Sequence, residues 1–357
     1  MASSLSEEAP AGALVAGLTR ADLHALYRTM LLVRTSEERL EILQKQGLLH
    51  GGLYRSLGQE AGPVGAAYAL RPRADGKGDV LAPTVRATGA CFVFGFTPLE
   101  YFRQYLGRGT GLTGGKEANL HCVDFARGII GPPSPLGTMV QVMAGVTLTF
   151  RMRGEDRVGI SFYGDGATST GAWHEGITFA AAQRCPLIVM VEANQWAFST
   201  RTERYTRVKT FADKGIGYGI PGESVDGNDP VAVYEVVSRA AARARVGEGT
   251  QLIELCTYRR LGHAQHDAME YMDQAELSEW EARDPIARFR QRLLDEGWAD
   301  ADEIAAIDRD VYERVTADAA RAAAEPLPAP EDALDGVYTD IVQRPPWTRL
   351  DPPDPRS

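Results

Sequence analysis

The centre of the chain alternates short apolar runs with helical stretches, and this alternation limits the fold more than any other feature. Apolar runs rich in β-branched residues at 158–163, 187–193 and 252–258 are separated by helical patterns at 171–184 and 230–246. This rhythm is typical of parallel strands joined by crossover helices. Continuously apolar strands indicate a sheet with helices on both faces. We therefore expect an α/β fold with a parallel sheet flanked by helices.

The sequence on either side predicts helical extensions and two terminal segments. Between Thr19 and Gln46, apolar residues recur at helical spacing among charges, which predicts a long amphipathic helix with Thr19 as its N-cap. Charged amphipathic patterns return at 277–324. The expected organisation is a flexible arm at 1–18, the α/β domain with its helical extensions at 19–325, and a proline-rich extended tail at 326–357.

Composition excludes several classes of protein. A net charge of -10 argues against a nucleic-acid or anionic-membrane binder, because such surfaces need a basic excess. No apolar run approaches transmembrane length, and the N-terminus lacks the features of a signal or transit peptide, so we expect a cytoplasmic protein. The cysteines show no paired spacing of a zinc site or redox dithiol, and we expect reduced thiols. They are Cys91, Cys122, Cys185 and Cys256.

A glycine-rich turn follows the apolar run at 158–163. This run leads directly into Gly164, Asp165 and Gly166, and then into a helix. Ligands of open parallel sheets bind beyond the carboxyl ends of the strands, and glycines allow a phosphate to approach the backbone closely. Asp165 brings a carboxylate to the same place. Because a carboxylate repels a diphosphate unless a cation lies between them, the turn predicts Mg²⁺ together with a diphosphate.

The next predicted strand, at 187–193, ends in Asn194-Gln195-Trp196. An amide oxygen and a backbone carbonyl are suitable ligands for Mg²⁺, so we predict Asp165, Asn194 and the Trp196 carbonyl as its protein ligands. Either turn alone would more often be structural. Their coincidence on adjacent strand–helix units favours a metal–diphosphate site. The rival, a nicotinamide-binding turn, is disfavoured because GDGATSTG lacks the G-x-G-x-x-G spacing.

Together these motifs resemble the thiamine diphosphate motif. From about Leu26 to Ala324 the chain is similar to the alpha subunits of 2-oxo acid dehydrogenases, a family that includes pyruvate, branched-chain and acetoin dehydrogenases. The resemblance implies a thiamine diphosphate-binding fold with thiamine diphosphate and Mg²⁺ as cofactors. It is also carried by SLGQEAGPVGAAYAL at 56–70, PLEYFRQYLGRGTGLTGGKEANLHC at 98–122 and PSPLGTMVQVMAG at 133–145.

The resemblance also implies roles for individual residues. Arg86 in PTVRATG matches the arginine that grips the diphosphate, while Ser134 and the backbone of Leu136 match contacts to the aminopyrimidine. His263 in RRLGHAQHD matches the catalytic histidine that contacts the bound intermediate and serves transfer to the lipoyl group. The expected cofactor-binding residues are Arg86, Ser134, Leu136, Gly164, Asp165, Gly166, Ala167, Asn194, Trp196 and His263.

The chain departs from the family pattern at three places. Val85 replaces the usual tyrosine before Arg86, and Thr88 replaces a frequent histidine. Ala264 stands where the animal enzymes carry a regulatory phosphoserine, so that switch is absent. The resemblance implies decarboxylation of a branched-chain 2-oxo acid or pyruvate, followed by reductive acylation of a lipoyl-bearing acyltransferase. An acetoin-cleaving dehydrogenase is the alternative.

The resemblance further implies a partner chain. One metal–diphosphate motif in 357 residues leaves no obvious room for a pyrimidine-binding domain, whose glutamate normally acts on the aminopyrimidine. We therefore expect that glutamate on a beta subunit, in an assembly of two alpha and two beta chains. Two rival interpretations are a non-catalytic regulatory subunit of the same fold and a one-chain thiamine enzyme, which should be longer.

Overall fold

A computed structural model describes residues 12–49, 51–131, 134–334 and 336. Its centre is a five-stranded sheet in the order β3-β4-β5-β9-β8, and every neighbouring pair of strands runs parallel. The prediction of a parallel sheet is therefore confirmed. The strands are β3 (Val80–Ala82), β4 (Gly159–Gly164), β5 (Leu187–Ala193), β8 (Gly222–Asp226) and β9 (Gln251–Cys256).

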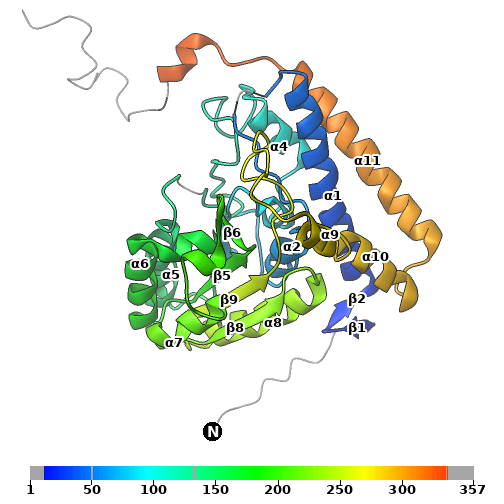
Figure 1. Cartoon of the computed structure of the whole chain (residues 1–357). Helices are drawn as coiled ribbons and strands as arrows, with labels where there is room; N and C mark the ends of the chain where they lie inside the picture. Colours follow the sequence, from blue (N-terminus) through cyan, green and yellow to red (C-terminus); the bar gives the residue numbers. More distant parts are fainter. Residues whose placement is uncertain (1–11, 50, 132–133, 335, 337–357) are drawn as a thin grey trace, which may run out of the picture.

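Helices cover both faces of the sheet. Along β5, Ile188 and Met190 belong to one buried cluster. Leu187, Val189 and Val191 belong to a second. Because successive side chains of a strand point to opposite faces, the two clusters mark the two sides of the sheet. The second cluster includes α5 (Met139–Arg153) and α6 (Gly171–Ala182), and the first includes α1 (Arg20–Lys45), α2 (Ala61–Tyr68) and α8 (Pro230–Arg245) (Figure 1).

At one end of the molecule, α1 and α11 lie side by side (Figure 1). The Thr19 side chain and Asp22 form a reciprocal capping box at the start of α1, which confirms Thr19 as the N-cap. In the middle of the pair, the Tyr27 hydroxyl donates a hydrogen bond to Asp308 at 2.8 Å. The charged region predicted to be helical forms three separate helices, each started by an aspartate N-cap. They are α9 (Gln274–Glu281), α10 (Pro285–Asp295) and α11 (Ala301–Ala324).

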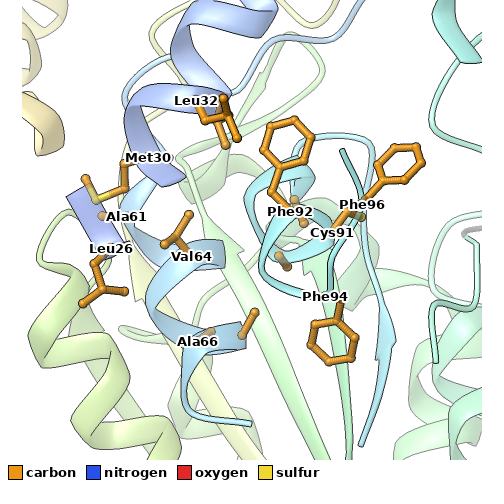
Figure 2. Close-up of a cluster of buried hydrophobic side chains, with 14 of the residues drawn as sticks. Leu26, Met30, Leu32, Ala61, Val64, Ala66, Cys91, Phe92, Phe94 and Phe96 are labelled. Atoms are coloured by element: carbon orange, nitrogen blue, oxygen red, sulfur yellow. The ribbon is translucent and has the colours of Figure 1, made fainter. Parts of the chain in front are cut away.

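An apolar cluster joins α1 and α2 to α3 (Thr88–Val93), the short helix that follows Arg86. Figure 2 shows side chains of all three helices in this cluster, among them Val64 of α2 and Cys91 of α3. The approach is close because Gly89 has no side chain: a Cβ there would lie 2.5 Å from Cγ2 of Val64. This packing holds the segment that carries Arg86 against the sheet.

The arm expected at residues 1–18 is in part a β-hairpin. Within it, β1 (Ala13–Val15) pairs antiparallel with β2 (Leu18–Thr19), and Leu18 is buried in the main core. In the expected tail, the Pro326 carbonyl accepts a hydrogen bond from the Gly109 N–H at 3.2 Å. The rest of the arm and tail, at 1–11, 335 and 337–357, lies outside the described residues.

All four cysteines are free thiols. Each helix within the described ranges is too short or too polar to span a lipid bilayer.

The remaining elements are short. They are α4 (Pro98–Tyr105), α7 (Lys214–Tyr218), β6 (Trp196–Ala197), β7 (Thr200–Arg201), η1 (Asp165–Ser169), η2 (Thr202–Arg204), η3 (Phe211–Asp213) and η4 (Pro330–Leu334).

Candidate functional site

A cavity of about 530 Å³ lies beyond the carboxyl ends of β3, β4 and β5. All ten residues that the sequence predicts to bind cofactor line it, although they come from segments up to 177 residues apart. The tertiary structure thus brings together every candidate residue. These residues are Arg86, Ser134, Leu136, Gly164, Asp165, Gly166, Ala167, Asn194, Trp196 and His263.

Asp165 is the first residue of η1, directly after β4, and only 1% of its surface is exposed. Its Oδ1 accepts a hydrogen bond from the Gly166 N–H at 2.7 Å, whereas Oδ2 is buried without a partner. Burial raises the pKa of Asp165, and the nearby Tyr205 hydroxyl opposes that shift. A buried carboxylate oxygen without a donor is costly unless a ligand satisfies it.

Asn194 follows β5, which pairs directly with β4, so Asn194 lies close to Asp165 at the same edge of the sheet. Its side-chain amide donates a hydrogen bond to Oε1 of Gln59 at 3.0 Å. Its Oδ1 is buried and has no partner. The amide is therefore anchored through its nitrogen, which leaves its oxygen available in the cavity.

The backbone between Asn194 and Trp196 is unusual. Gln195 has a φ of 74°, in the left-handed region that non-glycine residues rarely adopt. Its carbonyl accepts from the Thr202 N–H at 3.2 Å, in the hairpin where Trp196 pairs with Arg201. Because hydrogen-bonded and non-hydrogen-bonded pairs alternate in an antiparallel ladder, the Trp196 carbonyl does not face β7.

These oxygens fit a hard cation such as Mg²⁺. A carboxylate, an amide oxygen and a backbone carbonyl are all hard ligands, and Mg²⁺ usually takes few protein ligands, completing its shell with water and phosphate. The described residues contain no group of three or more His, Cys, Asp or Glu side chains arranged to hold a metal. The set formed by Asp165, Asn194 and Trp196 has one acidic member, so a cation held there would also need ligands from outside the chain, such as water or phosphate.

Arg86 and His263 contact each other in the lining of the cavity. The Arg86 guanidinium donates a hydrogen bond to the backbone carbonyl of His263, while its Nε is buried without a partner. The imidazole contacts the ring of Tyr54, with centroids 5.4 Å apart, and that of Phe198, at 4.5 Å. Burial, with the charges of Arg86 and Arg259, lowers the pKa of His263 to about 4, so the ring is neutral at neutral pH.

Ser134 and Leu136 lie at the rim of the cavity, in the loop that leads into α5. Both are exposed, and Leu136 keeps 67% of its surface accessible. An apolar side chain that exposed at the mouth of a cavity indicates a surface that is covered when a ligand or partner binds.

Sequence reasoning missed several residues of the site. Tyr54 and Phe198 flank the histidine, and Gln59 anchors Asn194 from a motif that the sequence marked without giving it a role. Glu192 is 3% exposed; its Oε2 accepts from the Thr84 hydroxyl at 2.8 Å, and its Oε1 is buried without a partner. A signal for Glu192 was present, because it is an acidic residue inside the apolar run LIVMVEA.

The fold and cavity define an α/β protein whose site, lined by a buried carboxylate, an amide and an arginine, lies beyond the ends of parallel strands. Comparison with protein families agrees with this architecture. The model described as Dehydrogenase E1 component matches residues 27–331, and the chain belongs to this family.

Curated relatives cover nearly the whole chain. The alpha subunit of the acetoin:2,6-dichlorophenolindophenol oxidoreductase of Cupriavidus necator is 34% identical over 90% of this chain and 95% of that protein. The pyruvate dehydrogenase E1 alpha subunit of Rhizobium meliloti is 32% identical over 93% of each chain. The 3-methyl-2-oxobutanoate dehydrogenase alpha subunit of Mycobacterium tuberculosis is 38% identical over 89% of this chain and 82% of its own length. The resemblance to alpha subunits of 2-oxo acid dehydrogenases is thus confirmed.

Proposed function

We propose that this chain is the alpha subunit of a 2-oxo acid dehydrogenase decarboxylase component and binds Mg²⁺ and thiamine diphosphate in the cavity. The observation that carries the proposal is the pair of buried oxygens without partners, Asp165 Oδ2 and Asn194 Oδ1, on neighbouring strand ends. Buried polar atoms in a folded protein are almost always satisfied, so both oxygens call for a ligand. A cation meets that need.

Each part of the cavity has a role in this proposal. Asp165, Asn194 and the Trp196 carbonyl would hold Mg²⁺, and Arg86 would bind the diphosphate with a charge-assisted hydrogen bond. Gly164, Gly166 and Ala167 would line the diphosphate site: a Cβ on Gly164 would meet nothing within 4 Å, whereas one on Gly166 would lie 2.6 Å from Cβ of Ala197. Ser134 and Leu136 would contact the aminopyrimidine. When bound, thiamine diphosphate supplies the electron sink for decarboxylation.

His263 would act at the reacting end. The aromatic rings of Tyr54 and Phe198 border its imidazole, which keeps water away and keeps the ring neutral. A neutral imidazole can donate one hydrogen bond and accept another. It would therefore hold the proton at an oxygen of the bound intermediate and serve transfer of the acyl group to a lipoyl-bearing acyltransferase.

The substrate pocket in this proposal is apolar. Val85, Leu136, Phe162 and Phe198 line the cavity, and Arg86 is the only Arg or Lys among its described lining residues. With Arg86 occupied by the diphosphate, no arginine or lysine remains to pair with a second substrate carboxylate. Branched-chain 2-oxo acids and pyruvate fit such a pocket. Acetoin cleavage is the second candidate, since one of the relatives described above is an acetoin oxidoreductase subunit.

A partner completes the site. Among the described residues that line the cavity, the carboxylates are Asp165 and Glu192, and both are buried at strand ends rather than at the rim beside Ser134 and Leu136. The carboxylate that acts on the aminopyrimidine would come from a beta subunit that covers this rim. An assembly of two alpha and two beta chains follows from the same proposal.

The test is to co-express the chain with the beta subunit of its source organism and to measure thiamine diphosphate binding by calorimetry with and without Mg²⁺. We expect Mg²⁺-dependent binding that Asp165→Ala abolishes and that Asp302→Ala, in an exposed part of α11, leaves unchanged. Turnover is then compared for pyruvate, branched-chain 2-oxo acids and acetoin. Binding that ignores Asp165→Ala would overturn the proposed site, and cofactor binding without turnover of any substrate would favour a regulatory subunit.

A further inference from the structure

Glu192 is a second buried carboxylate in the cavity that the proposed cofactor chemistry does not use. It is 3% exposed, and its Oε1 has no hydrogen-bond partner. Glu192 lies near the end of β5, Asn194 follows directly after the strand, and both residues line the cavity. Gly164, directly before Asp165, is the β4 residue that pairs with Glu192. The carboxylate therefore lies close to the proposed cation site.

The charged side chains around the cavity do not favour the binding of an anion without a cation. The cavity lining has two acidic side chains, Asp165 and Glu192, and one basic side chain, Arg86, while His263 is neutral at neutral pH. Burial raises the pKa of both carboxyls, and the Thr84 hydroxyl and the Arg86 charge oppose that shift at Glu192. When ionised, the two carboxylates outnumber the single guanidinium. In a buried site such charges act strongly, because little water screens them. A free diphosphate would be repelled, whereas a divalent cation would be attracted.

Glu192 and Arg86 are also complementary as a hydrogen-bond acceptor and a hydrogen-bond donor. Nε of Arg86 is a buried donor without an acceptor, and Oε1 of Glu192 is a buried acceptor without a donor. The Thr84 hydroxyl bonds the other oxygen of Glu192 at 2.8 Å and ties it to the segment that carries Arg86. A diphosphate that approaches Arg86 must therefore compete with the charge of Glu192.

We propose that Glu192 makes diphosphate binding conditional on the divalent cation. Without a cation, its charge opposes the diphosphate and neutralises Arg86. With the cation in place, the positive charge offsets both carboxylates and leaves Arg86 to the diphosphate. Glu192 is then a positioning residue that couples two ligands, and such coupling is reciprocal. The inference rests on the proposed function, because it assumes that a diphosphate and a cation share the cavity.

The alternative is a purely structural role, in which Glu192 only holds the Thr84 segment. Glu192→Gln separates the two roles, because an amide oxygen can still accept the Thr84 hydrogen bond while the charge is lost. Thr84→Val makes the opposite change: it removes the hydrogen bond and leaves the charge. Glu248→Gln is the matched control, because Glu248 is an exposed carboxylate in the turn after α8.

The experiment is calorimetric titration of the alpha–beta complex with thiamine diphosphate, in EDTA and in saturating Mg²⁺. For Glu192→Gln we expect the dissociation constant in EDTA to fall, and the ratio of the two constants to shrink by about tenfold, within the usual range of coupling. Thr84→Val and Glu248→Gln should keep the wild-type ratio. A ratio unchanged in Glu192→Gln, or reduced equally in Thr84→Val, would overturn the inference.

The two proposals fail in different ways. If the wild-type complex binds no thiamine diphosphate in either buffer, the proposed function is wrong. If it binds with Mg²⁺ dependence and Glu192→Gln keeps the same ratio, only the role of Glu192 is wrong. Inorganic diphosphate used as the titrant repeats the comparison without any contribution from the thiamine rings.

Discussion

The side-chain amide of Asn194 donates a hydrogen bond to Oε1 of Gln59, 135 residues earlier in the chain, at 3.0 Å. This bond leaves Oδ1 of Asn194 as a buried acceptor with no partner. A residue that fixes the orientation of a metal ligand through a hydrogen bond supports metal affinity. In the proposed site, Gln59 would therefore orient Asn194 to bind a cation through its oxygen.

This relationship predicts that Gln59→Ala weakens Mg²⁺-dependent binding of thiamine diphosphate about 10- to 100-fold, the usual effect of losing such a support. The cause is the loss of the acceptor that holds the Asn194 amide. Calorimetry of the alpha–beta complex measures the change. The control is Gln251→Ala, which removes a buried glutamine from the opposite end of the sheet. Equal losses of affinity in both variants would contradict the prediction.

Asp165→Asn should have opposite effects on the stability of the cofactor-free chain and on its stabilisation by ligands. The substitution keeps an acceptor for the Gly166 N–H but removes a buried charge whose second oxygen has no partner. We expect the cofactor-free chain to become more stable, by on the order of 1 kcal/mol, and the stabilisation by Mg²⁺ and thiamine diphosphate to disappear. Thermal unfolding with and without both ligands tests this. A cofactor-free variant less stable than the wild type would count against it.

His263 should make the chain less stable in mild acid. Its pKa falls from 6.5 to about 4 on folding, so between these values the unfolded chain binds a proton at this site and the folded chain does not. The stabilising contribution is therefore complete above about pH 6.5 and is lost as the pH falls towards 4.

The measurement is a histidine NMR titration together with denaturant unfolding at pH 7 and pH 5. In His263→Gln, the loss of stability between these pH values should be smaller than in the wild type, and the resonance that titrates near pH 4 should disappear. His174→Gln, at an exposed position on α6, should behave like the wild type. A His263 resonance that titrates above pH 6 would refute the assignment of a neutral ring.

Val85 should influence which substrates fit. It lines the cavity next to Arg86, so Val85→Tyr would fill part of the apolar space. We expect kcat/KM for branched-chain 2-oxo acids to fall about 10- to 100-fold relative to pyruvate, the range in which pockets discriminate by size. Mg²⁺-dependent cofactor binding should persist. A uniform fall for all substrates would indicate a damaged site rather than altered specificity.

Some of the fold was visible in the sequence because its signals are local. The strands β4 and β5 differ from the predicted ranges by at most one residue at each end, and α6, α8 and the Thr19 cap were found from apolar periodicity and capping chemistry. Two strands of the sheet were missed. β3 has only three residues, and β8 is largely polar, so neither shows a strand pattern over enough positions.

The residues of the site also fall into those that the sequence predicted and those that only the structure revealed. Asp165 and Asn194 could be named in advance, because the ends of consecutive parallel strands must meet at one edge of the sheet. Tyr54 could not, and for Glu192 the sequence signal was incomplete. Tyr54 lies in a loop without periodicity, and an acidic residue within a strand gives no indication of what it will face.

The sequence by itself determined the α/β class, the strand ends that carry the site and the residue types that suit a cation and a diphosphate, because backbone preference and side-chain chemistry are properties of short segments. Only the tertiary structure decided that Gln59 orients Asn194, that Arg86 reaches the His263 carbonyl, and that Glu192 keeps one carboxylate oxygen without a partner in the same cavity. These relationships depend on packing between segments distant in the chain. Burial strengthens the interactions of their charges and makes polar atoms without partners costly. It arises only once those segments have come together.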